Sequence, residues 1–159
     1  MNLDTTQSKQ ANTTIWQNQS PSSTVVYTAG NQMGLVGDTI ISWCFAEKQG
    51  FSKFGKYKGN GNADGPFIYT GFKPAWLMVK KTDGTANWDI TTAAISQNQI
   101  DERLRANLSN AEESSGYVDF LSNGFKMRNT NGSQNNGSYI YMAFAEHPFV
   151  SSKGVPVTA

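Results

Sequence analysis

The sequence predicts an all-β fold, an antiparallel β-sandwich of jelly-roll-like form with an extended N-terminal arm. Short apolar runs are separated by turns rich in Gly and Asn, and no segment carries a convincing long helical pattern. Hydrophobic residues make up 38% of the chain and charged residues 16%, and most of the remainder is Asn, Gly, Ser, Thr and Gln. This composition disfavours helices and is common in β-proteins with many turns.

The length of 159 residues is enough for one domain with a core and too short for two ordinary ones. We expect an arm over residues 1–23, a single sandwich domain over 24–150 and a tail over 151–159. The arm is polar except for Ile15 and Trp16. Such a segment is either a flexible tail or an arm docked on a partner. We favour docking, with Trp16 as the anchor and Ile15 beside it.

Strands are expected where β-type residues run between turn residues. Residues 38–47 are apolar at odd and even positions alike, which suits a strand buried on both faces, with Cys44 buried inside it. Residues 51–59 alternate instead, although Phe54 breaks the alternation. In chain order the expected strands lie at 24–28, 38–47, 51–59, 66–71, 74–81, 87–92 and 139–146, with a hairpin at 117–130 that turns at Ser-Asn-Gly.

The segment before that hairpin fits two periodicities. Ile100, Leu104 and Leu108 are four residues apart, as on one face of a helix, whereas Leu104, Ala106 and Leu108 are two apart, as on a strand. The charged residues favour a helical turn at 101–103. Because the surrounding sequence is β throughout, we expect a strand over about residues 103–108.

The chain contains the same strand ending twice. Residues 41–53 and 140–153 each carry an apolar run, then Phe-Ala-Glu, then an aromatic and a basic residue. Phe45 and Phe144 are 99 positions apart (144 − 45), as are Glu47 and Glu146 (146 − 47). Only part of a unit is duplicated, which indicates that the early strands join the later ones in one sheet system. We therefore expect the two Phe-Ala-Glu strands to take equivalent places in a single sandwich.

Charge and cysteine content exclude several classes of function. Lys and Arg number 13 against 12 Asp and Glu, so the formal net charge of +1 predicts no attraction to nucleic acid or to an anionic membrane. The single cysteine excludes an intrachain disulfide and a multi-cysteine zinc site. No run approaches the roughly 20 apolar residues of a membrane span, so we expect no membrane insertion. The N-terminus also lacks the basic-then-apolar pattern of a secretory signal.

No pattern of residues supports catalysis, so we expect no enzymatic activity, no metal and no cofactor. His147 is the only histidine, and the serines lack the glycine pattern of a nucleophile elbow. Glu112 and Glu113 are adjacent on an expected loop, where two carboxylates rarely converge across a sugar. Trp76 and Trp88 lie on expected strands, where tryptophan usually fills a core; stacking on a sugar ring is the alternative.

Several segments together resemble a known family. They are SWCFAEKQGFSKFGKYKGNGNADGPFIYTGFKPAWLMVKKTDGTANWDI, RLRANLSNAE, VDFLSNGFKMR and GSYIYMAFAEHPF, so that the resemblance covers about residues 38–149. The chain is similar to uncharacterised domains of bacteriophage virion proteins, notably of cyanophages and marine phages, which often form part of long tail-fibre chains. The resemblance implies a β-sandwich on the virion surface without enzymatic activity, and it brings no catalytic residues to carry over.

The resemblance implies a structural role on the phage particle. Because this chain is short and has its own polar arm, we expect a capsid decoration or cement protein that stabilises the head. The alternative is a tail-fibre or receptor-binding, lectin-like adhesin module that contacts a host surface glycan. The expected partners are phage capsid or tail proteins and, by analogy, two further copies in a homotrimer. The protein is then assembled in the host cytoplasm and carried on the virion.

Overall fold

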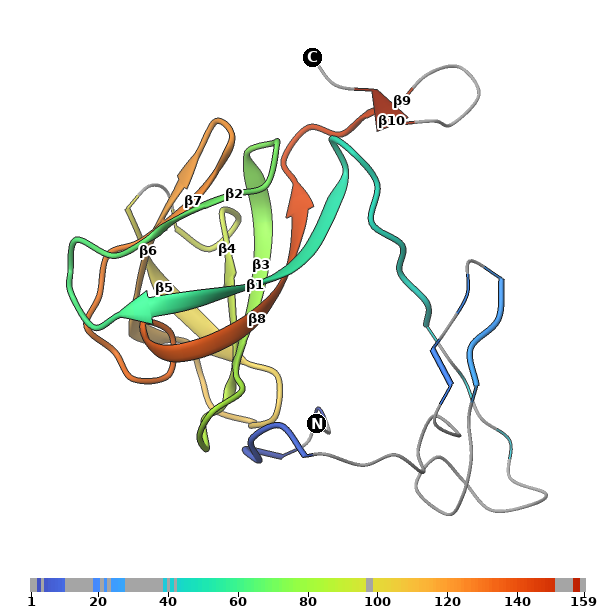
Figure 1. The fold of residues 1–159 in the computed structure, drawn as a ribbon. Helices are drawn as coiled ribbons and strands as arrows, with labels where there is room; N and C mark the ends of the chain where they lie inside the picture. The colour runs from blue at the N-terminus through green and yellow to red at the C-terminus, as the bar shows by residue number, and fades with distance from the viewer. Residues whose placement is uncertain are drawn as a thin grey trace. The chain divides into compact units, whose positions relative to one another are not determined.

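The structure is a computed structural model that describes residues 3, 5–10, 19–20, 22, 24–27, 39, 41, 43–96, 99–150 and 156–157. The chain divides into two compact units. One unit consists of Met1–Lys9 and Ala46–Ala159, and the other of Gln10–Phe45. The first unit contains every strand of the described residues (Figure 1). The expected division into 1–23, 24–150 and 151–159 stays a prediction.

The described residues form strands and no helix, which confirms the predicted all-β antiparallel fold. The strands are β1 (Ser52–Asn60), β2 (Phe67–Tyr69), β3 (Pro74–Lys81), β4 (Trp88–Thr92), β5 (Ile100–Arg105), β6 (Glu113–Leu121), β7 (Gly124–Met127), β8 (Asn136–Ala145), β9 (Phe149–Val150) and β10 (Pro156–Val157). The first eight make one antiparallel sheet in the order β1-β8-β3-β4-β5-β6-β7-β2, and β9 pairs with β10. The large sheet is curved until it nearly closes into a barrel (Figure 1).

The pairing register sorts the side chains of the first half of this sheet, β1-β8-β3-β4, onto two faces. Directly opposed residues of antiparallel strands share a face, and successive residues point to opposite faces. Tyr141 lies opposite Gly55 and Val79, while its neighbour Met142 lies opposite Phe54 and Met78. In the first row Tyr141 and Val79 are buried, and in the second row Phe54, Met78 and Met142 are half-buried. We call the first row the inner face and the second the outer face.

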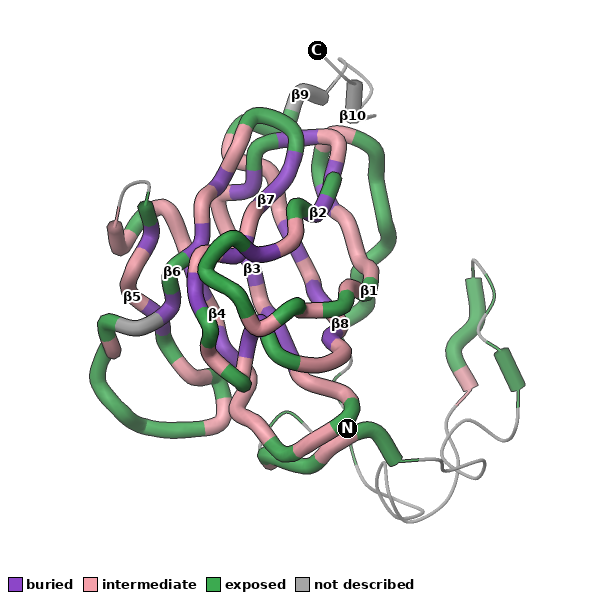
Figure 2. The backbone as a smooth tube through the Cα atoms, turned by 60° about the vertical axis from the view of Figure 1, so that its left-hand side comes forward, coloured by how far each residue is buried: buried purple, intermediate pink, exposed green. Residues whose placement is uncertain are grey.

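The inner face encloses the core. Figure 2 shows buried positions on strands all around the sheet. Phe125 of β7 contacts Tyr57 of β1 and Tyr141 of β8, with ring centroids 6.0 Å and 5.2 Å apart. Strands far apart in the sheet order therefore meet across the interior, which is what curving the sheet achieves. The buried core residues are Ile68, Phe72, Leu77, Val79, Ile100, Val118, Phe120, Phe125, Met127, Tyr139, Tyr141 and Ala143.

Several predicted elements are confirmed. The hairpin at 117–130 is β6 and β7, with Leu121 paired to Gly124 across the turn. The ambiguous segment is a strand and not a helical turn, but it covers Ile100–Arg105 and ends before Leu108. The reason is burial: Ile100 is in the core, whereas Leu104 and Leu108 are exposed. The alternating apolar residues that suggested the longer strand therefore lie partly in a turn. In this turn the Leu108 amide donates a hydrogen bond to the Arg105 carbonyl at 3.2 Å.

Two predicted strands are wrong within the described residues. Residues 24–27 form no strand, and neither do 39, 41 and 43–47. Trp43 is 78% exposed, Ile41 is 72% exposed and Cys44 is exposed, so the expected burial of Cys44 is also wrong. A strand needs a partner for its backbone groups as well as an apolar pattern. The second Phe-Ala-Glu segment lies at the end of β8, between β1 and β3, whereas the described residues of the first segment are in no strand, so the two repeats do not take equivalent places.

Residues near the N-terminus are tied to the end of β3 through a buried lysine. The Lys80 ammonium donates to the carbonyls of Thr6 at 3.0 Å and Ala86 at 2.7 Å. The Ala86 amide donates to the Thr6 carbonyl at 3.0 Å, and the Lys9 amide donates to the Thr82 carbonyl at 3.0 Å. Lys80 is fully buried, and burial lowers its pKa although Asp89 opposes this effect. These contacts attach residues 5–9 to the end of β3 and to the residues that follow it.

We expect Lys80→Met to release this N-terminal contact while leaving the sheet folded. The substitution removes both side-chain donors from the Thr6 and Ala86 carbonyls but keeps an unbranched side chain of similar length. Native-state hydrogen exchange should show the amides of Lys9 and Ala86 exchanging about tenfold faster or more, with the β7 amides unchanged. Lys81→Met is the matched control, because the Lys81 ammonium donates to Asn136 in an exposed position. Equal exchange in the two variants would contradict the role of Lys80.

Candidate functional site

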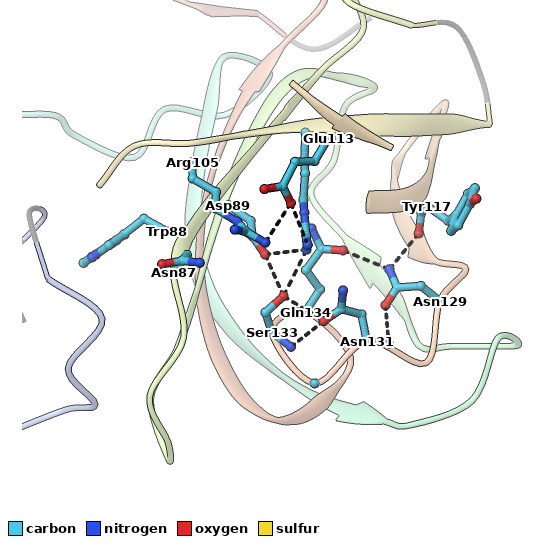
Figure 3. Close-up of polar contacts among 12 residues, drawn as sticks. Asn87, Trp88, Asp89, Arg105, Glu113, Tyr117, Asn129, Asn131, Ser133 and Gln134 are labelled. Carbon is cyan, nitrogen blue, oxygen red and sulfur yellow. Dashed lines mark hydrogen bonds and ion pairs between the residues drawn. The ribbon is translucent and has the colours of Figure 1, made fainter. Parts of the chain in front are cut away.

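A buried ion-pair network lies on the inner side of β4, β5 and β6 (Figure 3). Asp89 of β4 accepts hydrogen bonds from Arg103 of β5 at 3.1 Å and from the Ser133 hydroxyl at 2.9 Å. Arg103 also reaches Glu113 of β6 at 3.5 Å, and Arg105 binds the same Glu113 carboxylate at 2.8 Å. Two acidic and two basic side chains from three adjacent strands therefore neutralise one another.

The network continues into the loop that precedes β8. The Asn129 side chain donates to the Tyr117 carbonyl at 3.0 Å and to Gln134 at 2.9 Å. Asn131 turns the loop, because its side chain accepts a hydrogen bond from the Ser133 amide at 2.8 Å. Asn and Ser favour such local side-chain to backbone bonds, which is why this polar sequence folds as a fixed loop. The loop thereby brings the Ser133 hydroxyl to Asp89.

This network joins β4, β5, β6 and the loop before β8. The Asp89 side chain is 1% exposed, so no ligand reaches it. Burial raises the pKa of the Asp89 carboxyl, and the Arg103 charge opposes that effect. The Glu113 carboxylate is bound by two arginines, whereas the adjacent Glu112 is exposed on the loop before β6. The two carboxylates therefore have different surroundings, and the absence of catalysis stays a prediction.

The outer face of β1, β8, β3 and β4 is the candidate binding surface. Cross-strand partners place apolar side chains from all four strands on this one face. These side chains are half-buried, while the opposite face of the same strands is the buried core. The apolar residues of the outer face are Phe54 on β1, Ile140, Met142 and Phe144 on β8, Trp76 and Met78 on β3, and Trp88 and Ile90 on β4.

Two hollows lie along this face. The apolar groove has a volume of about 490 Å³ and is lined by Phe54, Gly55, Met78, Lys80, Trp88, Ile140, Tyr141 and Met142. The basic pocket, of about 440 Å³, is lined by Lys9, Lys56, Tyr57, Lys58, Thr82, Ser138, Tyr139 and Ile140. Both hollows include Ile140, so the apolar groove and the basic pocket adjoin.

The structure separates the residues predicted to act at a site. Trp76 and Trp88 both lie on the outer face, but only Trp88 lines the apolar groove. Trp76 packs against Phe144 with ring centroids 5.6 Å apart, and the Lys80 ammonium lies 5.9 Å from the centre of the Trp88 ring. Sugar stacking by the two tryptophans stays a prediction. The predicted arm anchors Ile15 and Trp16 lie outside the described residues.

Sequence reasoning missed the outer face, although two signals for it were present. Phe54 breaks the alternation of its strand because it faces the apolar groove while its neighbour Gly55 lies opposite Tyr141 on the inner face. In β8 both faces of the strand carry apolar side chains, since Tyr141 and Ala143 face the core and Met142 faces outward. Apolar residues on both faces of a strand indicate that both faces have something to contact.

Neither a metal cluster nor a membrane helix is found in the described part of the chain. No three His, Cys, Asp or Glu side chains of these residues gather where they could share a metal ion. The described residues also contain no helix with the length and apolar character that a membrane span requires.

Comparison with known proteins identifies one family. The family model described as a domain of unknown function, DUF7483, matches residues 1–148. No curated protein and no solved structure matches the chain.

We expect the buried ion pair to be a major contributor to stability. Asp89→Asn leaves the Arg103 charge without its closest partner, and breaking a buried pair in this way should lower the free energy of unfolding by about 3 kcal/mol. Urea unfolding measures the change. The matched control is Glu47→Gln, which breaks an ion pair with Lys53 that is exposed at both ends and should cost little. The prediction is wrong if the two substitutions have the same effect.

Proposed function

Because the chain belongs to the DUF7483 family of domains of unknown function, we propose its role from its sequence resemblance and the character of its surface. We propose that it is a structural protein of the bacteriophage particle surface, in the first place a capsid decoration or cement protein. On this proposal it is assembled in the host cytoplasm, carried on the virion and has no enzymatic activity. Its partners are capsid or tail proteins and further copies of itself in a trimer.

The observation that carries this proposal is the apolar outer face. Contiguous partly exposed apolar side chains over four strands are characteristic of surfaces that contact another protein. Met78 and Met142 are prominent there, and methionine side chains adapt to the shape of a partner. The Asp89 carboxylate, by contrast, is buried and paired with Arg103, so it is not accessible as a reactive group. A binding role therefore accounts for more of the structure than a catalytic one.

We also propose that the curved sheet is best understood as a sandwich of jelly-roll-like form. The half-sheet β1-β8-β3-β4 supplies Tyr57 and Tyr141, and the half-sheet β5-β6-β7-β2 supplies Phe125, which contacts both across the core. The halves are joined through the short pairing of β4 with β5. In this arrangement the outer face of the first half is free to lie flat on a particle.

The second candidate function is a tail-fibre or receptor-binding adhesin. The observation in its favour is the position of Trp88 in the wall of the apolar groove, where an indole face could stack on a sugar of the host surface. Against it, the Lys80 ammonium is already bonded to two carbonyls. Apart from the Trp88 indole N–H, the side chains that face the groove have no further strong hydrogen-bonding group: they are Phe54, Met78, Ile140 and Met142. Protein docking is therefore the better proposal.

The attachment proposal predicts that Met142→Glu abolishes binding to the particle. A carboxylate in the middle of an apolar interface is desolvated without a partner, so affinity should fall about thirtyfold or more. Cosedimentation with particles that lack this protein measures binding, and urea unfolding establishes that the variant is folded. The matched control is Leu108→Glu, at a position that is exposed and outside the groove.

Electron microscopy of antibody-labelled particles then separates the two candidates. Label on the head supports decoration, and label confined to the tail supports the adhesin. Particles without label, together with equal cosedimentation of the Met142 and Leu108 variants, would defeat the particle-surface role altogether.

A further inference from the structure

The lining of the apolar groove restricts what it can bind. Phe54, Met78, Ile140 and Met142 present only carbon and thioether sulfur, and the ammonium of Lys80 already donates to two carbonyls. A sugar buried there would leave most of its hydroxyl groups unbonded, at a cost for each group. Apolar side chains of a protein segment carry no such cost. The groove therefore favours a peptide over a polysaccharide.

The basic pocket beside the groove adds a second requirement. Lys56 and Lys58 are exposed on the same face of β1 as Phe54, and Lys9 reaches the pocket from the N-terminal segment. None of these three lysines has an ion pair within the described residues. Among the residues that the structure describes, no carboxylate lines either hollow.

Asp83 is an acidic residue close to this pocket, and it is already engaged, because it accepts a hydrogen bond from the Ser138 amide at 2.8 Å. Burial favours the neutral carboxyl of Asp83, but its hydrogen bonds with Ser138 and the nearby Lys81 charge outweigh this effect and lower its pKa. Because Ser138 lines the pocket, Asp83 lies beside the lysines, but no ion pair joins it to one of them. Within the described part of the chain, three positive charges without an ion pair therefore stand on one side of an apolar groove, where an incoming ligand can bind them.

We infer that the outer face binds an acidic, apolar segment of a partner protein. Its Leu-, Phe- or Ile-type side chains enter the groove at Met78 and Met142, and its Asp or Glu side chains reach Lys9, Lys56 and Lys58. This inference rests on the proposed attachment function and names the chemistry of the partner. Burying an apolar side chain contributes more binding free energy than an exposed ion pair does. The groove therefore supplies affinity, and the lysines supply selectivity and orientation.

The test is selection of binding peptides from a random displayed library on the full chain. The selected peptides should combine apolar residues with neighbouring Asp or Glu. A fluorescein-labelled selected peptide should then bind at least tenfold more weakly to Lys56→Glu and to Lys58→Glu, and binding should weaken as salt is raised. Lys48→Glu is the charge-matched control, because Lys48 is exposed and outside both hollows. A version of the peptide with Gln in place of each Asp and Glu should bind the unsubstituted protein about as weakly as the original peptide binds the two lysine variants.

Three results would overturn the inference. They are selected peptides without acidic residues, equal binding of the peptide to the Lys56, Lys58 and Lys48 variants, and displacement of the labelled peptide by polygalacturonate at a lower concentration than by the unlabelled peptide.

The outcome of this test is separable from that of the proposed function. Particle binding without selection of acidic peptides means that the partner chemistry is wrong and attachment stands. Acidic peptide binding without particle binding means that the docking surface stands and the virion role is wrong. Self-association that is lost in Met142→Glu, with no peptide selected, assigns the face to a second copy instead.

Discussion

The pairing of β8 on both of its edges is the interaction on which the rest of the structure depends. Its residues are matched with β1 from Ser52 to Asn60 and with β3 from Pro74 to Lys81, so it is the strand that joins the first half of the sheet. It is also apolar on both faces. Tyr139, Tyr141 and Ala143 enter the core, and this burial drives the sheet to curve around them. The β8 side chains that alternate with these residues then point outward.

The β8 side chains on the outer face connect the fold to the proposed function. When a sheet curves, the side chains of its inner face are buried against the strands on the opposite side. The outer face must then be polar, be covered by another segment or be available to a partner. In β1-β8-β3-β4 it is largely apolar, although Lys56 and Lys58 stand at its margin. The residues that make the core possible therefore also leave a surface suited to docking. Stability and binding arise from alternate residues of the same strand.

Buried polar groups complete the fold at places where apolar packing stops. Asp89 Oδ2 accepts hydrogen bonds from Arg103 and Ser133 inside the sheet, although Asp89 Oδ1 and Arg103 Nε have no hydrogen-bond partner there. The loop of Asn129 and Asn131 is shaped by its own side chains. Buried charges are costly singly and less costly together, because opposite charges lie beside one another. Lys80 follows the same rule with two carbonyls as partners, and it thereby attaches residues 5–9 to the sheet.

The sequence by itself determined the all-β class, most of the strand positions from residue 51 onward and the hairpin turn between β6 and β7, because alternation and turn residues are local properties of the chain. Only the tertiary structure decided which of the two Phe-Ala-Glu segments became a strand: β8 found two partners, while Trp43 and Cys44 stayed exposed. It also decided the candidate site, since the groove and its lysines come from four strands and the N-terminal segment. Periodicity shows that a strand has two faces, but long-range pairing decides what each face meets, and no local pattern encodes that pairing.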